Sequence, residues 1–251
     1  MKRRIGLLMS LCLVLGPALS ACRAPSRPDA GPEPAQAEDG VWMATPRIAS
    51  VVPKAAGGAL VRGEAAPGAR VILSGGDGAA MAAGADSRGL FELHIGAAAL
   101  GQVLTPEIQI GQSTTPGPQR LLLAGEGGEL AALLIDGEPS LRLTPGPALD
   151  AVDGDGRGLT ASGRAAPGER VAVRAGSDVV HAVTDARGRW IAVVPGVGDI
   201  SVEIGVGGRA FRYPGPGAPA DRAERAGGGW RVTRVLSGAA RQTSWFPDEN
   251  A

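Results

Sequence analysis

The hydrophobic positions of this chain alternate with polar ones over short runs, as in β-strands that bury one face. Every second position is apolar in residues 70–74 and 170–174, and again in residues 90–95 and 189–194. The apolar positions are Val71 and Leu73, Val171 and Val173, Phe91, Leu93 and Ile95, and Trp190, Ala192 and Val194. Glu92 and His94 fall on the other face of the first long run, whereas Ile191 and Val193 make both faces of the second one apolar.

Further short apolar runs predict further strands, and no segment has the pattern of an amphipathic helix. These runs are residues 121–123, 130–135, 200–206, 211–213 and 230–236. The 40 glycines and 20 prolines separate the runs and do not form tracts, which favours short strands joined by turns. The pattern therefore predicts an all-β protein.

Two motifs occur twice, with a period of about 100 residues. Residues 63–71, with the sequence GEAAPGARV, match residues 163–171, with the sequence GRAAPGERV. Residues 86–91 match residues 185–190 once a single residue is removed from the intervening stretch. The same order and nearly the same spacing indicate duplication of one domain.

Each motif contains a turn. In the Ala-Pro-Gly step, proline presets φ and Gly68 or Gly168 supplies a positive φ, which predicts a type II turn. In the Asp-x-x-Gly step that begins at Asp86 or Asp185, the carboxylate can accept backbone N–H bonds, so we expect a hairpin loop there.

These motifs resemble those of bacterial Ig-like domains, whose repeats show a Gly-x-Ala-x-Pro-Gly-x-x-Val turn and strand and then a Thr-Asp-x-x-Gly-x-Trp step. Residues 184–190 match the second motif fully, whereas the first copy has Ala85 and Phe91 in place of its Thr and Trp. The resemblance implies two tandem Ig-like β-sandwiches, which we place at residues 47–138 and 139–248. Its motifs are structural and bring no catalytic residue.

The N-terminus has the features of a secretory signal. Lys2, Arg3 and Arg4 precede an apolar stretch at residues 5–15 that is too short to span a bilayer. Residues 19–22, Leu-Ser-Ala-Cys, resemble the bacterial lipobox, which implies a signal peptide at 1–21 and lipidation of Cys22. Arg23 follows the cysteine, and by the same resemblance we expect the outer membrane. The alternative is an ordinary signal peptide that is cut near Ala21.

Residues 22–46 are expected to form a disordered tether, since the part before Val41 contains four prolines and almost no apolar residue. Removal of the first 21 residues leaves 22 bases against 25 acids, a formal charge of −3. This charge and the scarcity of aromatic residues argue against a nucleic-acid partner.

No motif predicts an enzyme, a cofactor or a metal site. His94 and His181 are the only histidines, and they fall in different predicted domains. The Asp153–Gly156 segment superficially resembles a calcium loop but lacks its later oxygen ligands, so a turn at the entry to the second domain is the better interpretation. Glycine-rich residues 204–208 and 227–229 lack the other residues of a phosphate loop.

The tryptophans are the remaining candidates for a site. We expect Trp190 and Trp230 to fill the second core, because so few aromatic residues are available. Trp42, Trp245 and Phe246 would be candidate binding residues if they were exposed, and otherwise would cap the ends of the sandwiches.

The sequence therefore predicts a lipid-anchored envelope protein, held at the membrane through Cys22, that is a non-catalytic binding or scaffolding module for an envelope protein. The alternative is recognition of a cell-wall glycan by exposed aromatic rings. An envelope hydrolase would require acids, histidine and serine that converge in one cleft.

Overall fold

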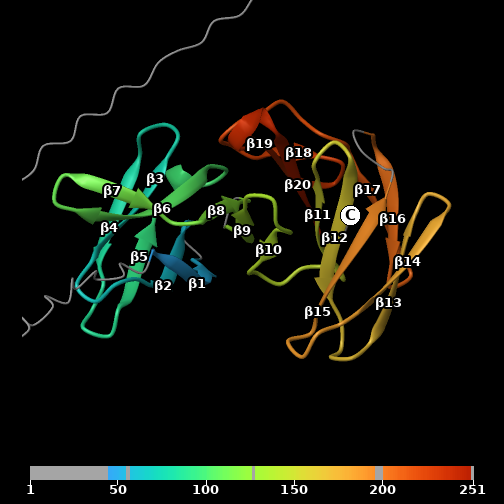
Figure 1. Ribbon diagram of the computed structural model, residues 1–251, viewed down its shortest axis with the longest axis horizontal. Helices are drawn as coiled ribbons and strands as arrows, with labels where there is room; N and C mark the ends of the chain where they lie inside the picture. The colour runs from blue at the N-terminus through green and yellow to red at the C-terminus, as the bar shows by residue number, and fades with distance from the viewer. Residues whose placement is uncertain (1–44, 55–56, 126–127, 196–199, 250–251) are drawn as a thin grey trace, which may run out of the picture. The chain divides into compact units, whose positions relative to one another are not determined.

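The computed structural model describes residues 45–54, 57–125, 128–195 and 200–249, which belong to one compact unit (Figure 1). The predicted signal peptide, Cys22, Trp42 and nearly all of the predicted tether lie outside the described residues. No helix in the described part is long and apolar enough to cross a membrane.

The protein is all-β, and its antiparallel sheets pack as sandwiches. Within the described ranges, the helical segments are two short 3₁₀ turns, η1 (Ala97–Ala99) and η2 (Ser237–Ala239). The first copy of the repeat forms β1 (Arg47–Pro53), β2 (Ala59–Glu64), β3 (Arg70–Gly75), β4 (Ala80–Gly84), β5 (Leu90–Ile95), β6 (Val103–Ile110) and β7 (Ser113–Pro116). The second copy forms β11 (Leu149–Gly154), β12 (Gly158–Arg164), β13 (Arg170–Ala175), β14 (Asp178–Val183), β15 (Arg189–Pro195), β16 (Val202–Val206) and β17 (Arg209–Tyr213).

The two copies have the same strand pairing. In the first, β1-β2-β5 face a sheet in which β4, β3, β6 and β7 are neighbours. In the second, β15-β12-β11 and β14-β13-β16-β17 repeat this arrangement. An irregularity in strand pairing also recurs. The register of the β1–β2 pair shifts between Ile48 and Ser50, and that of the β11–β12 pair shifts between Leu149 and Ala151. The duplicated sequence is thus a duplicated seven-stranded unit.

The two repeated motifs bind each other in both copies. The type II turns form as predicted, with the N–H of residue 69 or 169 bonded to the carbonyl three residues before it and a positive φ at the glycine. In the first copy, Ala65 N donates to Gly89 O at 2.8 Å, and in the second Ala165 N donates to Gly188 O at 3.1 Å. The motifs recur together because each turn supplies the backbone partners of the other.

The Asp-x-x-Gly step is not a hairpin loop, which corrects the prediction from sequence. β4 and β5 lie in different sheets, as do β14 and β15, so each step carries the chain across the sandwich. The predicted carboxylate bonds are present: Asp185 Oδ1 accepts from Arg189 N at 2.9 Å and from Arg187 N at 2.8 Å. These backbone N–H groups lower the pKa of Asp185, and the equivalent bonds from Leu90 and Arg88 lower that of Asp86.

The first glycine of the repeat makes room for the aromatic residue of the second motif. A Cβ on Gly163 would lie 2.0 Å from Ala148 O and 2.5 Å from the Trp190 ring. On Gly63 it would lie 2.2 Å from Arg47 O and 2.5 Å from the Phe91 ring. Gly63 pairs with Phe91, and Gly163 pairs with Trp190, on neighbouring strands. This contact explains why the first motif begins with glycine and the second ends with an aromatic residue.

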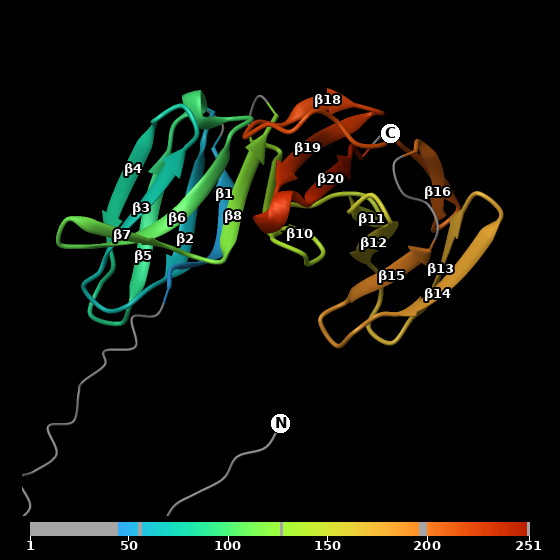
Figure 2. The same ribbon diagram turned by 45° about the horizontal axis from the view of Figure 1, so that its top comes forward.

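The strands outside the repeat join different sheets in the two halves. β8 (Gln119–Ala124), β9 (Leu130–Ile135) and β10 (Leu141–Arg142) extend the sheet of β6. β18 (Glu224–Ala226), β19 (Gly229–Val235) and β20 (Arg241–Pro247) extend the sheet of β11. Figures 1 and 2 show these six strands between the two copies of the repeat.

Three hydrophobic cores result. The first, around Phe91, lies inside the first sandwich, and the second, around Trp190, lies inside the second, as predicted for that residue. The third core lies between β8 and β9 on one side and β11, β19 and β20 on the other, and Trp230 packs on this core and not on the second. Its buried members are Val103, Leu122, Ala124, Leu130, Ala132, Leu134, Ala151, Ala223, Val232 and Phe246.

We expect Gly163→Ala to lower the free energy of unfolding by about 1–3 kcal/mol, because a backbone carbonyl and a fully buried ring must both move. Gly84→Ala is the matched control, since nothing lies within 4 Å of its added Cβ. Urea titrations of both variants measure the difference. Equal stability of the two would contradict the packing role of Gly163.

Candidate binding surface

The aromatic residues predicted as possible ligand contacts near the C-terminus are buried. Trp245 and Phe246 have no exposed surface. Trp245 Nε1 donates to Ala226 O at 2.8 Å, and its ring meets Tyr213 edge-on, with 6.2 Å between centroids. Phe246 lies in the third core. The structure therefore corrects the binding role considered for these two rings, which belong to the interior on opposite faces of β20.

The histidines and the acidic loop show no catalytic or metal-binding arrangement. His94 is exposed on β5 beside Lys54, and His181 is exposed on β14. Asp155 Oδ1 accepts from the N–H groups of Arg157 and Gly158, which closes the β11–β12 hairpin and lowers the pKa of Asp155. The described residues contain no group of three or more His, Cys, Asp or Glu side chains that could hold a metal ion.

The most distinctive exposed feature is strand β15. It is the end strand of its sheet and, within the described residues, pairs only with β12. Trp190, Ala192 and Val194 point into the second core, as predicted. The alternate side chains point outward, with Ile191 56% and Val193 63% exposed. An edge strand with an apolar outer face presents both unpaired backbone groups and a hydrophobic surface.

The equivalent strand of the first copy is protected by charge. β5 is also an end strand, but Glu92 and His94 occupy its outer face. Arg62 Nε on the adjacent strand donates to Glu92 at 2.8 Å, and Lys54 Nζ lies 2.5 Å from His94 Nδ1. Charged side chains of this kind discourage strand addition. β5 and β15 therefore occupy equivalent places in the fold but differ in the polarity of their outward side chains, which controls whether another strand can pair with the edge.

A buried carboxylate contacts the start of β15 through a partly exposed ion pair. Asp150 is fully buried and accepts from Arg164 Nε at 2.9 Å, while Arg189 Nη2 lies 3.8 Å from the same carboxylate. Burial raises the pKa of Asp150, and the charge of Arg164 opposes the shift. The first copy has Glu64 and Leu90 at the positions of the two arginines, so this ion pair is particular to β15.

A groove of about 350 Å³ lies beside Val193. Pro139 and Leu236 contribute apolar lining, and Asp155 and Arg157 contribute charged groups. The outer face of β15 thus continues into a concave surface that extended ligands can enter.

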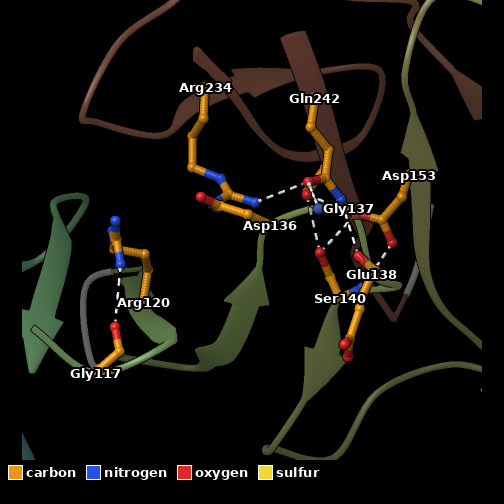
Figure 3. A network of polar contacts seen from close by, with 10 residues as sticks. Gly117, Arg120, Asp136, Gly137, Glu138, Ser140, Asp153, Arg234 and Gln242 are labelled. Carbon is orange, nitrogen blue, oxygen red and sulfur yellow. Dashed lines mark hydrogen bonds and ion pairs between the residues drawn. The ribbon is translucent and has the colours of Figure 1, made fainter. Parts of the chain in front are cut away.

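The β9–β10 loop lines part of this groove, and a polar network holds the loop in place (Figure 3). Asp153 accepts from Ser140 N at 2.7 Å and from the hydroxyls of Ser140 and Ser244, each at 2.6 Å. Gln242 Nε2 donates to Glu138 O at 2.9 Å. These bonds join the β9–β10 loop to β11 and β20, so the loop is held by strands from the other half of the protein. Burial raises the pKa of Asp153, against the lowering effect of the Ser140 and Ser244 hydrogen bonds.

A second cavity, of about 490 Å³, also includes a residue of the β9–β10 loop, Asp136, in its lining. Arg120, Asp136, Asp221 and Arg234 line it. Arg234 Nη1 donates to Asp136 at 2.5 Å, and Figure 3 shows Arg120 apart from that pair. The charges in its lining balance, so this cavity selects neither an anion nor a cation by charge alone.

The sequence indicated the apolar residues of β15 but not the polar network around Asp153. The apolar residues of β15 were visible on both faces, but that pattern is equally typical of a strand buried on both sides. Ser140, Asp153 and Ser244 are separated by up to 104 residues, and nothing in their local sequence links them.

Comparison with known proteins does not assign a family. No protein-family model and no curated protein matches the chain. A solved structure described as a Ca²⁺-stabilized adhesin that helps an Antarctic bacterium reach out and bind ice is 16% identical, with a TM-score of 0.25. The match covers 68% of this chain and 47% of that one. A superposition this poor supports no inference about ligand or function.

We expect Asp153→Ala to lower the free energy of unfolding by about 2–4 kcal/mol at neutral pH, because three buried donors lose their acceptor. The folded-state pKa of Asp153 lies above the unfolded one, so its contribution to stability is largest at low pH and falls as pH rises through the folded value. The cost of the substitution should therefore increase as the pH is lowered. Urea titrations at several pH values measure it, with Asp155→Ala on the exposed hairpin as control. A cost independent of pH would contradict the raised pKa.

Proposed function

We propose that this protein is a lipid-anchored lipoprotein of the bacterial cell envelope and that its two Ig-like sandwiches form a non-catalytic protein-binding module. Cys22 is the proposed anchor, at the outer membrane, and residues 22–46 are the proposed tether. Binding occurs by strand addition at the outer edge of β15, a mode in which backbone hydrogen bonds supply affinity and alternate side chains supply specificity.

The observation that carries the binding proposal is the contrast between β15 and β5. Both are end strands at equivalent places, yet one has Ile191 and Val193 outward and the other has Glu92 and His94. A solvent-exposed edge gains little in stability from an isoleucine and a valine that are more than half exposed. A partner strand that pairs with β15 would bury part of this apolar surface through cross-strand side-chain contacts.

The burial of two candidate rings argues against glycan recognition as the main function. That alternative depended on exposed rings at Trp42, Trp245 and Phe246, and the last two are buried. An apolar strand edge suits a polypeptide better than a sugar, because only a polypeptide supplies matching backbone donors and acceptors.

The anchor is tested by acyl labelling. We expect wild-type protein in its native host to incorporate a clickable palmitate analogue and Cys22→Ala to incorporate none. Cys12→Ala is the matched control, since Cys12 lies within the apolar run of the signal and should not affect labelling. Label on the Cys22→Ala protein would refute lipidation at this residue.

Strand addition at β15 is tested by site-specific photocrosslinking in living cells. A photoreactive phenylalanine analogue at position 193 should give protein adducts, because its side chain is exposed on the outer face of the end strand, beside the unpaired edge. The same analogue at position 92, on the charged edge of β5, is the control. The proposal fails if position 193 gives no more adduct than position 92.

A further inference from the structure

We propose that the partner of β15 is the β15 strand of a second copy of this protein, paired antiparallel about a two-fold axis. This proposal rests on the proposed function, because it takes the binding edge as given and identifies what covers it. The pairing would join the two six-stranded sheets that contain β15 into one continuous sheet.

The side chains of β15 complement themselves in this arrangement. With Ala192 on the two-fold axis, Ile191 of each copy lies opposite Val193 of the other, and directly opposed residues have Cβ atoms about 4.5–5.5 Å apart. On the neighbouring strand β12, Thr160 pairs with Val193 and Ser162 with Ile191. Both of these β12 residues are uncharged, so no charged side chain of β12 lies directly beside Ile191 and Val193.

The charges at the ends of β15 favour the antiparallel orientation. Arg189 begins the strand and Pro195 ends it. In the antiparallel register each Arg189 lies opposite Pro195 of the other copy, which separates the two arginines by about 20 Å along the strands. A parallel pair would place the two guanidinium groups side by side, which costs energy at a partly buried edge.

Two other occupants fit less well. Residues 22–44 belong to this chain, but they include Pro25, Pro28, Pro32 and Pro34, none of which has an N–H to donate to a neighbouring strand. β5 of a second copy would place Glu92 and His94 against Ile191 and Val193. A second β15 is the occupant from this chain that meets both the backbone and the side-chain requirement.

Disulfide trapping in isolated membranes tests the pairing and its register. Full-length Ile191→Cys and Val193→Cys chains with different tags are expressed together and then oxidised mildly. We expect a species of twice the monomer mass that carries both tags and disappears on reduction. A Glu92→Cys and His94→Cys pair on β5 is the matched control, and the wild-type chain controls for Cys22.

A mass measurement on the detergent-solubilised full-length protein completes the test. Wild type should be a dimer and Val193→Lys a monomer, whereas Glu92→Lys should match wild type. A monomeric wild type, or trapping that is equal at β15 and β5, overturns the homodimer. If photocrosslinks at position 193 contain only a different protein, the homodimer is refuted while the binding function of β15 stands.

Discussion

The apolar layer between the two repeats is the interaction on which the rest of the structure depends. It requires β8 and β9 to be hydrophobic on both faces, with Leu121 and Leu123 in the first core and Leu122 and Ala124 in the third. If the two sandwiches were joined only by a linker, the faces that now form the third core would be exposed to solvent and would have to be polar. Instead, each half leaves an apolar face that only the other half covers.

The layer is built by segments that the duplication does not share. The repeated strands form two similar seven-stranded units, whereas β8–β10 extend one type of sheet and β18–β20 extend the other. Because the additions join non-equivalent sheets, the two halves meet through unlike surfaces and do not form a symmetric pair. A polar network beside the apolar layer, centred on Asp153, adds directional bonds to this non-directional contact.

The sequence predicted what depends on local pattern. The strand faces around Phe91 and Trp190, the type II turns and the carboxylate-capped loops all follow from alternation, proline, glycine and aspartate at short spacing. The sequence-based prediction failed where the structure depends on contacts between segments that are distant in the sequence. The Asp-x-x-Gly step has the local hydrogen bonds of a hairpin loop, but here the same bonds form where the chain crosses from one sheet to the other. The local sequence is therefore the same in both cases.

Strand β20 shows the same limit. Its run of Gln242, Thr243 and Ser244 appears suited to solvent, but these side chains are buried and bonded to partners on β19, β11 and the β9–β10 loop. Polar residues are compatible with a core when their partners are present, and those partners lie far away in the sequence. The burial of Trp245 and Phe246 follows from that placement, so their role as packing residues required the tertiary structure.

The two end strands show how a duplicated fold can acquire a difference in surface chemistry without a change in architecture. β5 and β15 share their pairing, their aromatic first core residue and the turn that precedes them. They differ at the outward positions, where substitution leaves the core undisturbed. The Asp150 ion pair holds the start of β15 and has no counterpart at β5, so the apolar edge is also the one tied to a buried carboxylate. A surface that is both apolar and fixed in place loses little entropy when a partner strand pairs with it, which is the physical reason for the proposal that binding occurs there.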